Sequence, residues 1–411
     1  MLFRVLELVP TLACDLFGEI GVHVGKRTKA RYLTEVVFED FEHDRPDGFI
    51  AIKNWKALIE AKCDSNNLCS DQVGRYVEVA KHHKLDAVIT ISNEMVARPT
   101  HHPCYKLSKS EERKLSLYHL SWQLIFTRIC LWVEREEALD HEQLELLTDF
   151  RDFLKEKTSG LQRFDRMSPS WKLLLQDIRK LAKSERLPST NQHIRPVVRD
   201  WFLEERDLAL KLSEQLKAPI KLHIPRKFVD GNKSEERLES TAKELLQNLH
   251  LETHFIIPNA ADVLCIRADL IQRKIEVSMK LRATQDSSST RGRIGWLKRM
   301  LRDVDDDYLD MTLVTLRWSG KSGPEVFSVR EIFQWRKMPA HFPSSPVASF
   351  EIRMQSGESN AFQSPSKFIL EVEHLTSLYY WQVGERLKRW VPKPPKLDHV
   401  IEPHAPAGNR Y

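Results

Sequence analysis

The chain has 411 residues, enough for two or three domains that each bury a core, and its 41% hydrophobic and 29% charged residues are typical of a globular protein. No run approaches the roughly 18 uninterrupted apolar residues of a membrane helix, and the N-terminal stretch lacks the order of a signal peptide, so we expect neither a membrane-spanning nor a secreted protein. The net charge of +5 is compatible with a polyanionic partner but too mild to indicate one. Six cysteines without a C-x-x-C pair predict reduced thiols in a cytoplasmic protein.

The first hundred residues read as a helix, three strands, a second helix and a further strand. "YLTEVVFEDF" at 32–41 is rich in strand formers, and "GFIAI" and "KALIEA" are apolar runs separated by a turn. Ser70 is a suitable N-cap for a helix whose apolar residues follow at helical spacing. "DAVITIS" at 86–92 is typical of a central strand.

The turn at Lys53-Asn54 fixes the register of the hairpin between the two apolar runs. It pairs Asp47 with Glu60, and because side chains alternate along a strand, Lys62 lies on the same face. Two carboxylates this close repel each other unless a cation lies between them, and Mg²⁺ is commonly held by one or two carboxylates. A solvated ion pair at a strand edge is the alternative. The opposite face, expected to be the packed one, carries Ile50, Ile52, Ala57 and Ile59.

This order of elements, with these residues on the second and third strands, resembles the PD-(D/E)XK nuclease superfamily, which has the restriction-endonuclease-like fold. The resemblance covers about residues 1–95 and includes a Q-x-x-x-Y similar to that of the RecB-type branch. The pattern also looks like a group of uncharacterised bacterial proteins with the same core. The residues that carry the resemblance are Pro46, Asp47, Glu60, Ala61, Lys62, Gln72 and Tyr76.

The resemblance implies an αβββαβ nuclease core at 1–107 that hydrolyses phosphodiester bonds with Mg²⁺ or Mn²⁺. Asp47, Glu60 and the backbone carbonyl of Ala61 would hold the ion, which activates a water and neutralises phosphate charge. Lys62 would position or help deprotonate that water, or stabilise the developing negative charge.

The resemblance also implies roles for the second helix and for an upstream glutamate. Gln72 and Tyr76 are four residues apart and share a helix face that could point at the carboxylates. They would orient the lysine, the water or a phosphate oxygen. Glu35 on the first strand is preferred as the upstream glutamate over Glu19 at the end of the first helix, and a surface carboxylate is the alternative interpretation of Glu35.

Two groups of histidines and cysteines near the core are interpreted as structural. "THHPC" at 100–104 has no second ligand cluster to complete a zinc site, so a surface loop is favoured. Cys63 and Cys69 flank the loop after Lys62, where small buried thiols are favoured over a redox gate.

The chain changes character after residue 107. Residues 108–190 predict a helical extension in which Trp122, Phe126 and Trp132 pack between helices instead of stacking on bases. Residues 195–391 predict an α+β domain that recognises substrate or binds a partner protein, and 392–411 a Pro-rich tail. The expected helices span 118–135, 140–157, 168–183, 197–216, 234–250, 295–304 and 366–390.

A basic helix after the polar loop "TQDSSSTRGR" could contact phosphates. A solvated helix face, balanced by the acidic residues 305–307, is the alternative. The residues concerned are Arg291, Arg293, Lys298, Arg299 and Arg302.

The sequence therefore predicts a metal-dependent nuclease that acts on DNA, in a setting such as bacterial defence against foreign DNA. DNA repair and RNA cleavage are alternatives. A non-catalytic assembly subunit that retains the nuclease fold is a further alternative from a different class. Endo- or exonuclease action and the oligomeric state, including a homodimer, stay open.

Overall fold

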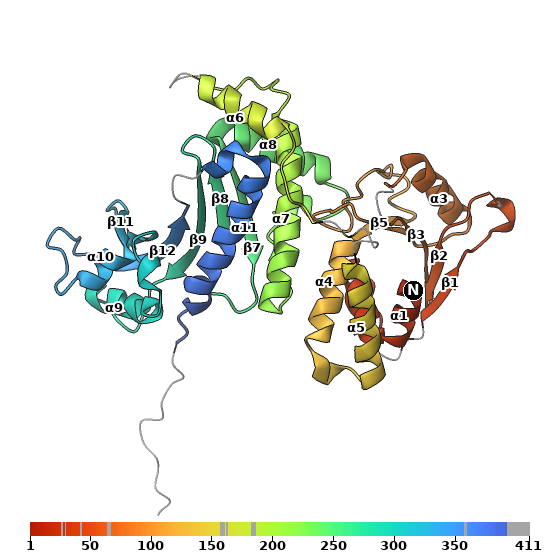
Figure 1. The fold of residues 1–411 in the computed structure, drawn as a ribbon, viewed down its shortest axis with the longest axis horizontal. Coiled ribbons are helices and arrows are strands. Elements are labelled where there is room, and N and C mark those ends of the chain that lie inside the picture. The colour runs from red at the N-terminus through yellow and green to blue at the C-terminus, as the bar shows by residue number, and fades with distance from the viewer. Residues whose placement is uncertain are drawn as a thin grey trace, which may run out of the picture.

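The structure is a computed structural model that describes residues 1–25, 28, 30–41, 43–63, 67–156, 161, 163–181, 186–356 and 360–392. The chain forms two parts, each built on one sheet, which lie side by side with α7 between them (Figure 1). Of the expected tail at 392–411, all but Pro392 lies outside these ranges. None of the described helices has the length and apolar character to cross a membrane.

The N-terminal part contains a five-stranded mixed sheet in the order β1-β2-β3-β4-β5, in which β1 to β3 are antiparallel and β3 to β5 are parallel. The strands are β1 (Ala30–Thr34), β2 (Gly48–Ile52), β3 (Trp55–Ala61), β4 (Ala87–Ser92) and β5 (Ser116–Ser121). The helices are α1 (Leu2–Leu8), α2 (Pro10–Glu19), α3 (Ser70–His82), α4 (Trp122–Val133) and α5 (His141–Lys155).

The β2–β3 hairpin has the register predicted from its turn. Gly48 pairs with Ile59 and Ile52 with Trp55 across a turn whose Lys53 adopts a left-handed φ of 55°. All six residues of β4 are buried, which confirms the central strand. The first strand is shorter than expected, because the chain leaves β1 after Thr34 and forms a 3₁₀ turn at Glu39–Phe41.

Both faces of this sheet are packed, which corrects the expectation of one packed face and one charged face. Ile59 and Ile89 belong to the core that α1, α2, α4 and α5 complete. On the opposite face, Leu58 packs with Val73 and Val77 of α3. The face that carries Glu60 is therefore enclosed by α3.

The fifth strand replaces the beginning of an expected helix at 118–135 and extends the sheet beyond residue 107. Leu117, His119, Leu120 and Ser121 are all buried, and a run buried on both faces cannot be told from a buried helix by periodicity. Ser121 then caps α4 by accepting a hydrogen bond from the backbone N–H of Leu124 at 3.1 Å. The aromatic stripe of α4 packs in the core, as predicted.

The C-terminal part contains a seven-stranded antiparallel sheet in the order β11-β10-β12-β9-β8-β7-β6. Its strands are β6 (Lys221–Leu222), β7 (His250–Ile256), β8 (Leu264–Asp269), β9 (Lys274–Arg282), β10 (Thr312–Trp318), β11 (Glu325–Ser328) and β12 (Val347–Gln355). Its helices are α6 (Ser170–Lys180), α7 (Ile194–Leu216), α8 (Ser234–Asn248), α9 (Thr290–Leu301), α10 (Val329–Gln334) and α11 (Pro365–Gln382).

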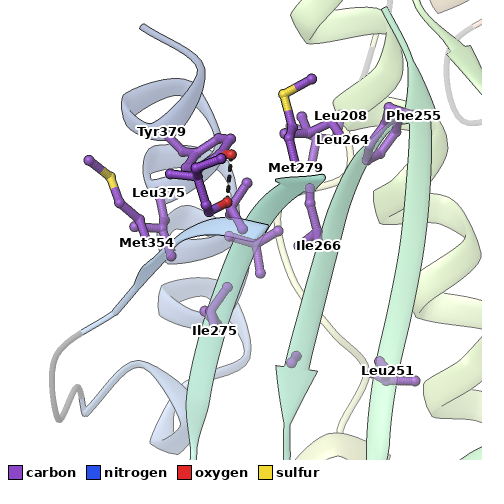
Figure 2. Packing of buried hydrophobic residues seen from close by; sticks show 14 of the residues in the cluster. Leu208, Leu251, Phe255, Leu264, Ile266, Ile275, Met279, Met354, Leu375 and Tyr379 are labelled. Carbon is purple, nitrogen blue, oxygen red and sulfur yellow. Dashed lines mark hydrogen bonds between the residues drawn. The ribbon is translucent and has the colours of Figure 1, made fainter. Parts of the chain in front are cut away.

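The core of this part lies between one face of the sheet and its helices (Figure 2). Ile266 of β8 and Met279 of β9 belong to this core, and the hydroxyl of Tyr379 on α11 donates to the carbonyl of Ile352 at 2.8 Å. Alternate residues such as Cys265 and Arg267 lie on the opposite face and are half-buried or exposed. This face of the sheet therefore carries polar residues and is in part open to solvent.

Candidate functional site

Glu60 is the most enclosed polar residue of the predicted site. It ends the buried run of β3, is 2% exposed, and its Oε1 accepts from Nε2 of Gln72 at 2.8 Å and contacts Nζ of Lys62 at 2.6 Å. Its Oε2 is buried and has no partner among the described residues. Burial raises the pKa of Glu60, the Lys62 contact opposes that rise, and the nearby Asp47 adds to it.

Asp47 immediately precedes β2, and the hairpin register places it opposite Glu60, as predicted. Its side chain is exposed, and its Oδ2 accepts a hydrogen bond from the backbone N–H of Ala61 at 2.7 Å. In an antiparallel pairing the N–H and C=O of one residue point to the same side. The carbonyl of Ala61 therefore faces Asp47, and carboxylate and carbonyl oxygens gather at this edge of β3.

Gln72 and Tyr76 approach Glu60 from α3, as their spacing predicted. Nε2 of Gln72 lies 2.8 Å from the Glu60 carboxylate and 3.0 Å from the Tyr76 hydroxyl. That hydroxyl donates to the carbonyl of Arg45 at 3.1 Å, and burial raises the pKa of Tyr76 to about 12. Tyr76 is therefore a neutral group that ties α3 to the segment leading into Asp47. The helix begins after an N-cap at Cys69, one residue before the expected cap Ser70.

The two upstream glutamates have different surroundings. Glu35 follows β1 with a left-handed φ of 53°, its backbone N–H donates to the carbonyl of Asp47 at 3.2 Å, and its side chain is exposed. Glu19 instead pairs with Arg128 of α4. Its helix meets β3 at the opposite end from Glu60, where the rings of Phe17 and Trp55 are 6.2 Å apart. Of the two, only Glu35 is next to Asp47.

An apolar cavity of about 360 Å³ reaches the same strand ends from the other face of the sheet. Asp47 and Ala61 form its polar edge, and Trp122 and Phe153 are among its apolar walls. The indole N–H of Trp122 donates to the carbonyl of Lys62 at 2.8 Å. Helix α4 thus holds the backbone of Lys62 in place from that side.

The donor atoms of this site suit a hard divalent cation. Carboxylate and carbonyl oxygens are the ligands that Mg²⁺ and Mn²⁺ prefer. Glu60 Oε2 is a buried oxygen without a partner within the described ranges. Because burying an unpaired polar atom is unfavourable, this oxygen is available to coordinate a cation. The residues therefore fit the ion that the sequence predicted.

A second polar group, formed by Thr90 and His119, lies beside Glu60 on the neighbouring strands β4 and β5 and was not predicted from the sequence. The parallel registers pair Glu60 with Thr90 and Thr90 with His119, so all three lie on the face under α3. Thr90 and His119 are both 0% exposed. The available signal was a threonine between two isoleucines of a buried strand, at the position that parallel pairing with β3 sets beside Glu60.

Hydrogen bonds fix the tautomers of two histidines around Thr90. Nε2 of His119 must donate to the carbonyl of Glu94 at 2.8 Å, so its Nδ1 accepts from the Thr90 hydroxyl at 2.8 Å. Nδ1 of His102 accepts from two backbone N–H groups of the next turn at 3.4 and 3.2 Å, so its Nε2 donates to Thr90 at 2.9 Å. The network is complete only while both rings are neutral.

This network overturns the expected surface loop at 100–104. His101 and His102 are 4% and 5% exposed, because the loop folds back over β4 and β5 to satisfy Thr90. Cys63 and Cys69, expected to be buried, are instead exposed. None of the six cysteines forms a disulfide, as predicted.

We expect acid to destabilise the protein through these histidines. Burial lowers the pKa of His102 from 6.5 to about 3 and that of His119 to about 4. The two neutral rings contribute fully to the free energy of unfolding above pH 6.5. As pH falls from 6.5 toward the lowered pKa values, only the unfolded chain binds protons, so this free energy decreases by about 1.4 kcal/mol per pH unit for each ring. Urea unfolding between pH 4.5 and 7.5 should show a shallower slope for His119→Gln than for the unmodified protein. His141→Gln, on the exposed surface of α5, should keep the original slope, and an unchanged slope in His119→Gln would contradict the assignment.

The expected phosphate-binding residues of α9 divide into two groups. The helix begins at Thr290, five residues earlier than expected, so Arg291 and Arg293 are helical and not in a loop. Arg293 donates to the carbonyls of Ser287 and Val347 at 2.8 and 2.6 Å. It therefore holds the loop to β12 and is half-buried.

Lys298 is also engaged, since its Nζ donates to the carbonyl of Trp335 at 3.2 Å and burial lowers its pKa. Arg302 pairs with Asp303 at 3.3 Å and is exposed, as are Arg291 and Arg299. Helix α9 lies at the opposite end of the molecule from α3 (Figure 1). Only three of the five expected residues are thus available to a ligand, and all are remote from Glu60.

Comparison with protein-family models, with curated proteins and with solved structures gives no match for this chain. What the site can do is therefore judged from the side chains that the fold brings together.

Proposed function

We propose that the protein is a metal-dependent nuclease of the PD-(D/E)XK type, acting on DNA. The observation that carries the proposal is the enclosure of Glu60, whose one oxygen meets Lys62 and Gln72 while the other is buried without a partner in the described structure. The succession α2, β1, β2, β3, α3, β4 follows the element order of that superfamily, which supports the same conclusion.

Asp47, Glu60 and the carbonyl of Ala61 are the residues that would hold the ion. When bound, a divalent cation lowers the pKa of a water and neutralises charge on a phosphate. The hydrogen bond from the Ala61 N–H fixes the Asp47 carboxylate, and Gln72 fixes that of Glu60. Neither carboxylate then has to reorganise when substrate arrives, which is the preorganisation that favours catalysis.

Lys62 is placed to act on the reacting phosphate or on the attacking water. Its side chain is 25% exposed, so Nζ reaches solvent while still touching Glu60. Its backbone is held on both sides, by the N–H bond to the Ile91 carbonyl at 2.8 Å and by Trp122. An ammonium held this way offers a positive charge where the negative charge of the transition state develops.

The second part of the chain is proposed to help grip the nucleic acid. The exposed Arg291, Arg299 and Arg302 offer phosphate contacts, whereas Arg293 and Lys298 are withdrawn from that role by their backbone acceptors. Because α9 is remote from Glu60, such contacts would hold a long substrate and would not take part in cleavage. Defence against foreign DNA is the proposed setting, by analogy with the superfamily, with DNA repair as the alternative.

The test is cleavage by the purified full chain. Supercoiled plasmid, linear duplex, single-stranded DNA and RNA are each incubated with Mg²⁺, Mn²⁺ or EDTA. We expect cleavage of DNA that requires the cation and stops in EDTA. Cleavage confined to RNA would show that the substrate is RNA and not DNA. Binding of DNA without cleavage under every cation would favour a non-catalytic assembly subunit.

A further inference from the structure

The polar face of the C-terminal sheet gathers a second set of metal-binding side chains, far from Glu60. Glu252 and His254 are two residues apart on β7, and their side chains share the face opposite the buried Leu251, Thr253 and Phe255. Cys265 of β8 pairs directly with His254, so it lies on the same face. One oxygen of Glu252, one ring nitrogen of His254 and the sulfur of Cys265 all lie within 4.8 Å of one another.

A fourth side chain comes from the edge of the sheet. Beyond β6, the backbone N–H of His223 donates to the carbonyl of His254 at 2.9 Å, which continues the pairing by one residue. The two imidazole rings are 6.1 Å apart between centroids and nearly perpendicular, at 70°. Three neighbouring strands thus present His223, His254 and Cys265 in one row, with Glu252 beside the row.

We propose that these four residues form a binding site for Zn²⁺ or a similar transition-metal ion. A thiolate and two imidazoles are ligands that select such ions, whereas Mg²⁺ and Ca²⁺ prefer oxygen alone. The negative charges of Glu252 and the Cys265 thiolate balance a divalent ion. His250, on the same face of β7, lies outside the group whose ligand atoms are all within 4.8 Å of one another. Its Nδ1 contacts the guanidinium of Arg267 at 3.3 Å, and its Nε2 lies 3.8 Å from the second oxygen of Glu252.

Coordination would add a side-chain link to the short backbone pairing between β6 and β7. The strand has two residues, Lys221 and Leu222, and forms the outer edge of the sheet. A bond from His223 to an ion held by β7 and β8 would fasten this edge and the segment after α7. The thiol proton of Cys265 leaves to solvent when the metal–sulfur bond forms, so binding releases a proton and strengthens as pH rises.

The test measures zinc on the intact chain. Protein stripped with EDTA is titrated with ZnSO₄, and bound zinc is counted after desalting. Co²⁺ is added to a second sample to look for a thiolate-to-cobalt charge-transfer band. We expect one equivalent of zinc, a charge-transfer band, and loss of both in Cys265→Ser and His254→Gln. The affinity should fall by more than the roughly 10–100-fold that loss of an outer-shell partner causes.

Three control variants locate the ion. Cys130→Ser replaces another half-buried free thiol, on α4, and should bind zinc normally. Asp47→Asn should also bind normally, which separates this site from the proposed nuclease site. His82→Gln tests the other ligand group of the described chain, formed by Asp40, His82 and His83.

Absence of bound zinc in the unmodified protein would overturn the proposal. So would zinc that persists in Cys265→Ser with unchanged affinity, or zinc that is lost in Asp47→Asn or His82→Gln. Circular dichroism of each variant in EDTA shows whether it has folded. These zinc-binding results do not depend on whether the protein cleaves DNA, so failure of the proposed nuclease function would not change them.

Discussion

Glu60→Gln, Asp47→Asn and Lys62→Met should each abolish DNA cleavage and leave the protein folded. Each change removes a charge at the proposed ion and phosphate site while keeping the shape of the side chain. The loss should exceed the roughly 10²-fold effect of an outer-shell metal partner. Gln72→Ala should have a smaller effect, because Gln72 orients Glu60 at 2.8 Å without being a proposed ligand. Initial cleavage rates on plasmid DNA in Mg²⁺ measure all four.

The chain offers a matched control for Asp47. Asp86 accepts a hydrogen bond from the backbone N–H of Lys56 at 2.7 Å, just as Asp47 accepts one from Ala61, but at the other end of β3. Asp86→Asn therefore replaces the same kind of charged acceptor by a neutral amide oxygen and should change stability by a similar amount. It should keep full cleavage.

Equal loss of activity in Asp47→Asn and Asp86→Asn would mean that the rate reports strand stability and not chemistry. Normal cleavage by Lys62→Met would show that the Lys62 ammonium is not required for catalysis. The proposed roles of the two carboxylates would be unaffected by that result. Normal cleavage by Glu60→Gln would remove the proposed function, since the enclosed carboxylate is the observation on which it rests.

The Asp47–Glu60 pairing could be predicted because its causes are local. A two-residue turn sets the register of a hairpin, and the register sets which side chains meet. The Thr90–His119 pair could not be predicted in this way. It depends on parallel pairing of β3, β4 and β5, which are joined by α3 and a long loop, and no short-range pattern fixes the register of such strands.

In the basic helix α9, the sequence could not predict which of the positive side chains are exposed. Arg293 and Arg299 are both arginines on one helix, but the first donates to two backbone carbonyls and the second is exposed. Which charges of a helix are free depends on the carbonyls that neighbouring loops present. Val347 is 54 residues away from Arg293, so composition alone could not separate the two.

Replacing Glu204 by methionine should stabilise the protein. Glu204 lies on α7, is 1% exposed, and both of its carboxylate oxygens are buried without partners among the described residues. Burial, with the nearby Glu373 and Asp207, raises its pKa well above the usual value. Burying an unsatisfied polar group costs about 1–3 kcal/mol in proteins, and methionine of similar volume removes that group.

The adjacent Glu205 is the matched comparison. It is also 1% exposed, but its carboxylate pairs with Arg237 and accepts from the Thr253 hydroxyl at 2.9 Å. Glu205→Met leaves the buried guanidinium of Arg237 without its carboxylate and should destabilise the protein by about 3–5 kcal/mol. Two neighbouring glutamates of equal burial should thus give opposite changes in the free energy of unfolding.

The gain in Glu204→Met should grow with pH. A carboxyl whose pKa is raised in the folded state contributes stability that is complete below its unfolded value near 4.5 and is lost as pH rises through the folded value. The unmodified protein therefore loses about 1.4 kcal/mol per pH unit from this group in that window, and the variant does not. Urea unfolding followed by tryptophan fluorescence at pH 5 and pH 8 measures the difference. A destabilising effect of Glu204→Met at both pH values would mean that the carboxyl is held by a stabilising hydrogen bond, and the opposite signs expected for the two neighbours would then have failed.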